Sequence, residues 1–524
     1  MAVVDARNES MSGAEALVGT LADNGVTACF ANPGTSEMHL VTALDSEPRI
    51  RSVLCLFEGV ATGAADGYAR VTGTPAMTLL HLGAGYLNAG ANIHNGGRAN
   101  SPMINVIGDH AVPHLQYDAP LTSDIAGLAG PNSRWLKSAD KVEETGTLAA
   151  EAYAASFGPA PGPVSLLLPA DSAWLEGGQK GGQVSPSPLR KVSETVIADA
   201  VTAIARAKNP VLIINGTALH EHGLQAAARL KAAGLRVLTD TFYSKMRRGA
   251  GLFAPERMQY FAEAAVDDLA GSDLMLVVGT RAPVAFFSYP GRPSLLVPDG
   301  CDLFDLGDAS TDSAATLAAL ADALGADAAA PVEGLTHPDA PTGELTAQAV
   351  GQSLARHMPE NALVSDDGVS NSIWSYLATQ TAQPHDWMML TGGAIGQGLP
   401  LALGAAVAAP DRKTICLSGD GAGMYTNQAL WSMAREGADV TTIVFVNHSY
   451  RILNIELYRT GAGNPGPTAK DMLSIGGPDI NWVQLSESMG VPAVEAMTAE
   501  GFDAALAEAI AAPGPRLIAA VVPG

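Results

Sequence analysis

Short apolar runs alternate with longer helical patterns along almost the whole chain. The runs are rich in β-branched residues and predict buried strands. Strands that alternate with helices form parallel sheets that are covered by helices on both faces. The pattern therefore predicts an α/β fold of doubly wound domains with parallel sheets. The predicted strands cover residues 26–31, 53–57, 76–81, 103–108, 164–168, 211–215, 236–239, 274–279, 362–365, 387–390, 414–418, 441–447 and 517–522.

Two segments interrupt this alternation, at residues 177–189 and 328–342. Both are rich in Gly, Pro and polar residues and lack apolar periodicity, as is typical of linkers. We expect the domain boundaries there. This gives an N-terminal domain over residues 1–180, a central domain over 190–330 and a C-terminal domain over 340–524, each large enough for one doubly wound sheet.

Composition and net charge exclude several classes of function. Apolar residues make up 47% of the 524 residues, which indicates a globular protein, and a net charge of −23 opposes binding to nucleic acids or anionic membranes. The sequence contains no run of 18 apolar residues, so we predict no membrane-spanning helix. The N-terminal segment lacks the basic and apolar regions of an export signal. The four widely spaced cysteines predict buried free thiols. We expect a cytoplasmic protein.

A candidate metal site follows two predicted strands near the C-terminus. Gly419, Asp420 and Gly421 come directly after one strand, and Asn447 ends the other, 27 residues beyond Asp420. A carboxylate and an amide oxygen at neighbouring strand ends suit Mg²⁺. Gly-Asp-Gly is also an ordinary turn, so the prediction depends on the asparagine at this spacing. The whole unit resembles the diphosphate-anchoring motif of thiamine diphosphate enzymes.

A second candidate group lies in the first block. Glu58 follows the predicted strand 53–57 and precedes a Gly/Ala-rich helix, GVATGAADGYARVTG. Such a carboxylate could share a proton with a ring nitrogen, although a helix N-terminus also favours a plain acidic residue. Together with ANPGTSE at 31–37 and TGGAIG at 391–396, these motifs make essentially the whole chain similar to thiamine diphosphate-dependent enzymes. The resemblance is nearest to acetolactate synthase (acetohydroxyacid synthase) large subunits, with benzoylformate decarboxylase as a relative.

The resemblance implies thiamine diphosphate and Mg²⁺ as cofactors, and it implies roles for individual residues. Glu58 would protonate the aminopyrimidine, and the Gly393 carbonyl would accept a hydrogen bond from its amino group. Ile395 would hold the cofactor bent, unless it is a core isoleucine. The metal ligands would be Asp420, Asn447 and Ser449. The remaining residues implied to contact the cofactor are Asn32, Pro33, Gly34, Gly368, Ser370, Gly419, Gly421, Ala422 and Tyr450.

Two histidines are candidate proton carriers. His81 lies 23 residues after Glu58, where benzoylformate decarboxylase has a catalytic histidine and acetolactate synthases do not. A histidine there could move protons near neutral pH, although a histidine packed at a strand end is the structural alternative. His110 ends another predicted strand and is the second candidate. A further departure is Val446 before Asn447 in place of the usual asparagine pair, which leaves the metal-binding position intact.

The expected substrate pocket is apolar. Phe286 and Phe287 stand where the decarboxylase relative has a second histidine, so its proton transfer cannot simply be carried over. Ile452 and Leu453 follow the metal turn and would add apolar wall. The pocket is therefore expected to be lined by Thr35, Phe286, Phe287, Ile452 and Leu453.

The leading hypothesis is an enzyme that decarboxylates a small 2-oxoacid and releases an aldehyde or joins the fragment to a second carbonyl, as acetolactate synthases do. A benzoylformate decarboxylase-like reaction and a 2-hydroxyacyl-CoA or oxalyl-CoA lyase are the alternatives. A nucleotide-dependent oxidoreductase is a hypothesis of a different class, which the lack of a GxGxxG turn disfavours. FAD is possible, since related synthases carry it, but no residue supports it. The resemblance also implies a homodimer or homotetramer with the cofactor between subunits.

Overall fold

The computed structural model describes residues 11–461 and 464–523. The chain separates into two compact units, Met1–Pro188 and Leu189–Gly524, and each is considered by itself. The sequence analysis expects no export signal in the N-terminal segment. Residues 1–10 of that segment lie outside the described residues. The three domains and the two boundaries between them, proposed from the two linker-like segments, stay a prediction.

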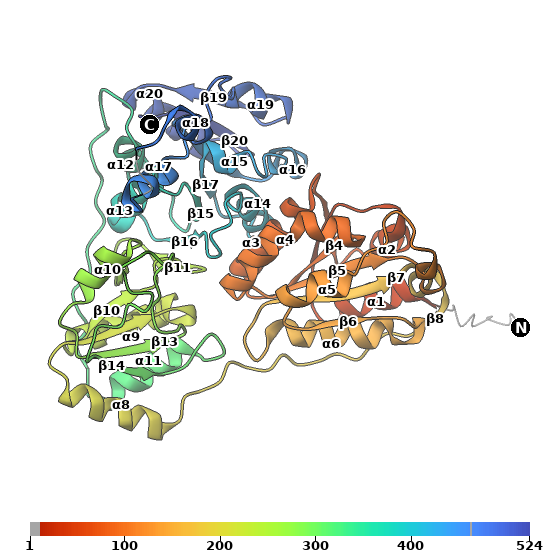
Figure 1. Ribbon diagram of the computed structural model, residues 1–524, viewed down its shortest axis with the longest axis horizontal. Coiled ribbons are helices and arrows are strands. Elements are labelled where there is room, and N and C mark those ends of the chain that lie inside the picture. The colour runs from red at the N-terminus through yellow and green to blue at the C-terminus, as the bar shows by residue number, and fades with distance from the viewer. Residues whose placement is uncertain (1–10, 462–463, 524) are drawn as a thin grey trace, which may run out of the picture. The chain divides into compact units, whose positions relative to one another are not determined.

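In its described part, the first unit contains a six-stranded parallel sheet (Figure 1). Helices α1 (Gly13–Asp23) and α6 (Thr145–Phe157) share one apolar core with the sheet. Helices α3 (Glu58–Thr72) and α4 (Leu82–Ala99) are rich in small residues and approach closely enough for a side chain-to-backbone hydrogen bond from Thr62 to Ala89, of 3.1 Å. The strand order is β3 (Arg51–Leu54), β2 (Ala28–Ala31), β4 (Ala76–His81), β5 (Met103–Asp109), β7 (Pro163–Pro169) and β6 (Leu136–Ser138).

Strand β3 is shorter than predicted. The pattern placed its end at residue 57, whereas it ends at Leu54, with one more hydrogen bond from the Cys55 amide to the Ala31 carbonyl at 2.8 Å. Leu56 is 47% exposed, so its apolar side chain is not part of a buried strand. Glu58 is therefore the first residue of α3 and not the residue directly after a strand.

The described part of the second unit contains two sheets (Figure 1). The five-stranded parallel sheet is packed against α8 (Glu194–Arg206), α9 (Glu221–Ala232), α10 (Ala262–Leu269) and α11 (Ser313–Ala323). Its strand order is β12 (Glu256–Arg257), β10 (Arg236–Thr239), β9 (Pro210–Ile214), β13 (Leu274–Val278) and β14 (Asp302–Asp305).

The seven-stranded sheet is parallel except for β11, which pairs antiparallel with β16. Strand β11 lies within the sequence of the predicted central domain, and one apolar core joins side chains of both sheets of this unit. The strand order is β11 (Met246–Arg248), β16 (His385–Met389), β15 (Leu363–Asp367), β17 (Thr414–Gly419), β18 (Val440–Val446), β20 (Arg516–Val521) and β19 (Ala493–Ala496).

Two further observations concern the expected class of protein. Among the described residues, no helix combines the length and apolar character that crossing a bilayer requires. The cysteines are free thiols, and those at 29, 55 and 416 are buried as predicted, whereas Cys301 is half-buried. Parallel sheets covered by helices confirm the predicted α/β fold class.

Candidate active site

Asp420 and Asn447 lie side by side at the carboxyl ends of two neighbouring strands. Asp420 follows β17 and begins the short helix α15 (Asp420–Gly423), while Asn447 follows β18. The Asp420 Oδ2 atom accepts hydrogen bonds from the backbone amides of Asn447, at 3.0 Å, and His448, at 2.7 Å. Its Oδ1 atom accepts the amide of Gly421 at 2.8 Å. The carboxylate thus ties the two turns together.

The donor chemistry of this pair fits a hard divalent cation. Asp420 and Asn447 are 4% and 8% exposed, so a carboxylate and an amide oxygen are held in a nearly dry site. Burial raises the pKa of Asp420, and the three backbone amides act in the opposite direction. Ser449 donates its amide to Asn447 Oδ1 at 3.2 Å, which brings all three predicted metal ligands into one region.

The turn between Asn447 and Ser449 is strained. His448 has a φ of 53°, in the left-handed region that residues other than glycine rarely adopt. Strain of this kind persists where the surroundings fix the backbone, and it clusters at functional sites. Within the described residues, no group of three or more His, Cys, Asp or Glu side chains could hold a metal.

The residues predicted to meet a diphosphate surround the same strand ends. Tyr450 covers Gly421, because a β-carbon there would lie 2.5 Å from its ring. Gly421 and Ala422 are buried in α15, although the Gly421 amide already donates to Asp420. Gly368 and Ser370 follow β15 and flank Val369, whose left-handed φ of 50° is a further sign of strain.

The turn that carries Gly393 and Ile395 leads into α14 (Gly398–Ala408). Ile395 is half-buried, so it is not the core isoleucine that was the alternative interpretation. Gly396 has a φ of 94°, and a β-carbon at this position would lie 2.5 Å from that of Tyr425, so only glycine fits. The turn therefore presents Ile395 from a tightly packed backbone.

Aromatic side chains lie against this turn. A β-carbon at Gly393 would lie 3.0 Å from the Phe286 ring, which belongs to the loop after β13. The Phe286 ring centroid lies 5.7 Å from that of Phe242, 5.3 Å from that of Tyr260 and 5.0 Å from that of Phe287. Phe286 and Phe287 are 45% and 51% exposed in the chain. The cluster presents an apolar wall beside the predicted cofactor turn.

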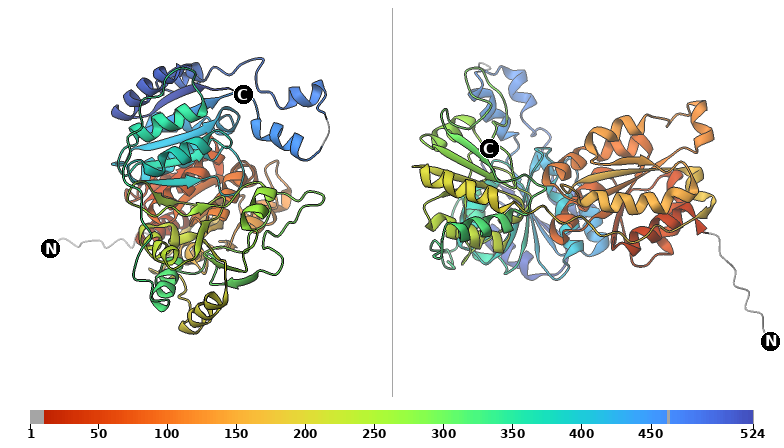
Figure 2. Two further views of the ribbon diagram at one scale, coloured as in Figure 1. Left: turned by 90° about the vertical axis from the view of Figure 1, so that its left-hand side faces the viewer. Right: turned by 90° about the horizontal axis from the view of Figure 1, so that it is seen from below.

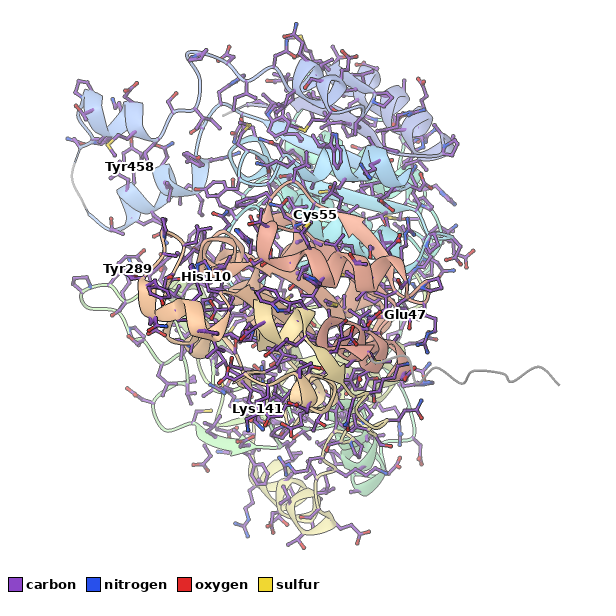
Figure 3. All side chains as sticks on the ribbon, turned by 90° about the vertical axis from the view of Figure 1, so that its right-hand side faces the viewer. Glu47, Cys55, His110, Lys141, Tyr289 and Tyr458 are labelled. Atoms are coloured by element: carbon purple, nitrogen blue, oxygen red, sulfur yellow. The ribbon has the colours of Figure 1, made fainter. Side chains whose placement is uncertain are left out.

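Helix α17 (Arg451–Arg459) is connected to the aromatic loop. Tyr289, labelled in Figure 3, donates its hydroxyl to Glu456 Oε2 at 2.7 Å. In Figure 2, α17 and α18 (Pro467–Met472) project away from the seven-stranded sheet, and neither has a buried residue. Ile452 is half-buried and Leu453 is 46% exposed, so the predicted pocket residues of α17 are accessible.

In the first unit, the Glu58 carboxylate lies at the start of α3 and is only 6% exposed. Asn88 of α4 donates its side-chain amide to Glu58 Oε2 at 3.0 Å. Asn32, Pro33 and Gly34 follow β2 and are half-buried, whereas Thr35 is exposed. These residues therefore follow the carboxyl ends of neighbouring strands, where open α/β sheets bind ligands.

His81 is held by a carboxylate that the sequence analysis did not assign. Its Nδ1 atom lies 2.9 Å from Glu37 Oε2 and 3.1 Å from the Ser36 hydroxyl. Glu37 is fully buried and also accepts the Gly34 amide, at 2.7 Å, and the Ser36 hydroxyl, at 2.6 Å. Because Nδ1 is engaged in this way, Nε2 is the ring nitrogen left to exchange a proton elsewhere. Glu37 is the last residue of the ANPGTSE segment at 31–37, but no periodicity of the sequence marked Glu37 as a candidate site residue.

His110 shares the sheet edge with His81. Strands β4 and β5 are parallel neighbours with His81 opposite Gly108, so both histidines lie at their carboxyl ends. The His110 ring (Figure 3) lies 5.3 Å from that of His114. Its buried Nε2 atom has no hydrogen-bond partner within the described part of the chain.

Two family models match the segments of the chain that contain these residues. Residues 11–128 match the model "Thiamine pyrophosphate enzyme, N-terminal TPP binding domain", and residues 367–520 match its C-terminal TPP binding domain. The chain belongs to the thiamine pyrophosphate enzymes. The two matches contain the Glu37–His81 pair with Glu58, and Asp420 with Asn447, respectively. The resemblance stated from the motifs is confirmed.

Relatives cover the whole chain. A Mycobacterium tuberculosis protein that bears the name of an acetolactate synthase large subunit, IlvX, is 48% identical over 98% of this chain and 99% of its own length. Benzoylformate decarboxylase of Pseudomonas aeruginosa is 28% identical over 94% of this chain and 96% of its own length. The fold is shared with the thiamine diphosphate-dependent 4-hydroxybenzoylformate decarboxylase of Rhodococcus jostii, with a TM-score of 0.85 at 24% identity over 98% of this chain and 99% of that one.

Proposed function

We propose that this thiamine pyrophosphate enzyme requires Mg²⁺ and cleaves or forms a carbon–carbon bond next to the carbonyl of a small 2-oxoacid. The pairing of Asp420 with Asn447 carries the proposal, because it offers the oxygen donors that a magnesium-bound diphosphate requires. When bound, thiamine diphosphate supplies a carbon nucleophile and an electron sink for the loss of CO₂. Acetolactate synthase-like decarboxylation with carboligation is the main candidate, in line with the 48% identical relative.

The chain's own residues have separate roles in this proposal. Asp420, Asn447 and Ser449 hold the metal, and Glu58 exchanges a proton with the aminopyrimidine. The Gly393 carbonyl and Ile395 orient the cofactor. The residues proposed to line its diphosphate or its ring are Asn32, Pro33, Gly34, Gly368, Ser370, Gly419, Gly421, Ala422 and Tyr450.

His81 favours a second candidate, a benzoylformate decarboxylase-like reaction that ends in protonation. Its Nδ1 atom is held by the buried Glu37, which suits a proton carrier that acts through Nε2, with His110 as the second candidate. The apolar side chains of Phe286, Phe287, Ile452 and Leu453 support a 2-oxoacid or aldehyde with an apolar side chain. Thr35 stays a further candidate for the substrate pocket. We further propose a cytoplasmic homodimer or homotetramer, as the family resemblance implies.

The test is to incubate the purified protein with thiamine diphosphate, Mg²⁺ and a panel of 2-oxoacids that includes pyruvate and benzoylformate, and to identify the products by NMR. An acyloin or acetohydroxyacid supports the synthase reaction, and an aldehyde alone supports the decarboxylase. Glu58→Gln should abolish turnover and keep cofactor binding. The matched control is Glu47→Gln, which changes a carboxylate paired with Arg49 at the surface of the same unit (Figure 3). Full turnover by Glu58→Gln would contradict the proposal.

A further inference from the structure

Asp367, the last residue of β15, is bonded to the turn that carries Gly393 and Ile395. Its Oδ2 atom accepts the backbone amide of Gly396 at 2.7 Å and that of Gly398 at 3.2 Å. The side chain is 1% exposed, so these bonds are shielded from bulk water, and removal of the carboxyl group would take away the acceptor of both amides. The position of the turn therefore depends on this side chain.

The carbonyl groups of the same two glycines are also held by buried side chains. The Thr426 hydroxyl donates to the Gly396 carbonyl at 2.8 Å, and the Ser365 hydroxyl donates to the Gly398 carbonyl at 2.8 Å. Thr426 is 3% exposed and Ser365 is fully buried. These three buried side chains thus bind the amides and the carbonyls of both Gly396 and Gly398, in the backbone that directly follows Ile395.

A helix cap is the ordinary explanation for a carboxylate at the start of α14. A Ser or Asn side chain would cap the helix without burying an acid, which is costly. Here burial raises the pKa of Asp367 to about 7, and the neighbouring Asp366 carboxyl adds to the effect. The Asp367 Oδ1 atom has no hydrogen-bond partner within residues that the structure describes. An arrangement that costs stability beside a candidate site points to a functional role.

We propose that Asp367 is a positioning residue that fixes the backbone of residues 393–398 in the form that receives the aminopyrimidine of thiamine diphosphate, and thereby sets the affinity for this cofactor. The inference rests on the proposed function, because it assumes that this turn contacts the cofactor. The Ser365 and Thr426 bonds hold the same turn from its carbonyl side.

The first measurement is hydrogen–deuterium exchange of the full-length protein without cofactor. Asp367→Ala should speed exchange in the peptide that covers residues 391–398 at least about tenfold, since the Gly396 and Gly398 amides lose their acceptor. Asp367→Asn should keep the protection, because its amide oxygen can accept the same bonds. The matched control is Asp386→Asn in the same sheet, whose carboxylate pairs with Arg412 at 2.6 Å and not with the turn. It should leave exchange in this peptide unchanged.

The second measurement is the Kd of thiamine diphosphate at saturating Mg²⁺ by calorimetry. Asp367→Ala should weaken binding about tenfold or more, with Asp367→Asn and Asp386→Asn within about threefold of the wild type. Unchanged exchange or unchanged affinity in Asp367→Ala would overturn the inference, whereas a wild type that binds no cofactor would overturn the proposed function itself. If Asp367→Ala does not fold, it is replaced by Thr426→Val, which removes the hydrogen bond to the Gly396 carbonyl. Normal exchange with normal affinity in that variant would also overturn the inference.

Discussion

The Nδ1 atom of His81 lies 2.9 Å from the Oε2 atom of Glu37, a carboxylate with no exposed surface. The same Oε2 atom accepts a hydrogen bond from the Gly34 amide at 2.7 Å. The backbone therefore fixes the carboxylate that contacts the His81 ring. A β-carbon at Gly34 would lie 2.2 Å from His81 Nδ1, which places the ring directly against this turn. One buried acid thus links a predicted cofactor segment to the predicted proton carrier.

Glu37→Gln should impair turnover more than cofactor binding. The glutamine amide can donate to Nδ1, which favours the opposite tautomer and leaves Nε2 protonated. We expect kcat to fall about tenfold or more, with the Kd of thiamine diphosphate nearly unchanged. Steady-state kinetics, together with ¹⁵N NMR of the imidazole, would test both expectations.

Ser36→Ala is the matched control for this change. It removes the hydroxyl that lies 3.1 Å from His81 Nδ1 and donates to Glu37 Oε1 at 2.6 Å, but it keeps the contact between Glu37 Oε2 and His81 Nδ1. The ring tautomer should therefore stay that of the wild type. Equal losses of kcat in the two variants would show that Glu37 has no special part in orienting His81.

Asp420→Ala should abolish the uptake of Mg²⁺ and thiamine diphosphate. The change removes the carboxylate that is proposed to bind the metal and that accepts hydrogen bonds from three backbone amides. The negative charge and the hydrogen bonds that hold the two turns together are therefore both lost. Calorimetry should show binding at least about a hundredfold weaker. Asp479→Asn, which alters an exposed carboxylate 3.5 Å from His448, is the control and should bind normally.

Chelation of the metal gives the same test without a mutation. Treatment of the wild type with EDTA should abolish turnover, and added Mg²⁺ should restore it. Turnover that persists after exhaustive chelation would contradict a metal role for Asp420 and Asn447.

The proximity of Asp420 and Asn447 could be predicted from the sequence, because both follow apolar runs and the carboxyl ends of parallel strands meet at one edge. The importance of Glu37 could not. It lies in a polar segment without periodicity, and its contact with His81 depends on β2 and β4 being neighbours in the sheet. Sequence order alone does not give that neighbour relationship.

Asp367 shows a second limit of sequence patterns. Its strand was predicted to cover residues 362–365, the extent of the apolar run. The strand continues to Asp367, since the Asp366 and Asp367 backbones stay paired with β17 and the Asp367 side chain has acceptor sites inside the protein. The three residues of β11 likewise carry no alternating pattern, and their pairing with β16 follows from tertiary packing.

Phe286→Ala should lower activity toward 2-oxoacids with bulky apolar side chains more than toward pyruvate. Loss of the ring opens space beside Gly393 and removes apolar contact area, which for a phenyl ring contributes about 2 kcal/mol to binding. The ratio of kcat/KM for benzoylformate to that for pyruvate should fall at least about tenfold. Leu303→Ala removes an apolar side chain that is 47% exposed on β14 and should leave the ratio unchanged.

The stability of the wild type relative to Asp367→Asn should depend on pH. Burial raises the pKa of Asp367 from 3.8 to about 7, so between these values the folded protein binds a proton that the unfolded chain does not. The stabilisation from this group is complete below about pH 4 and is lost as the pH rises through about 7. The asparagine variant lacks the titration, and both proteins keep Asp366. Urea unfolding from pH 4 to pH 8 should therefore show the free-energy difference moving in favour of Asp367→Asn by up to about 1.3 kcal/mol per pH unit, then levelling off. A difference that is constant across this range would show that Asp367 is ionised to the same extent in the folded and unfolded states.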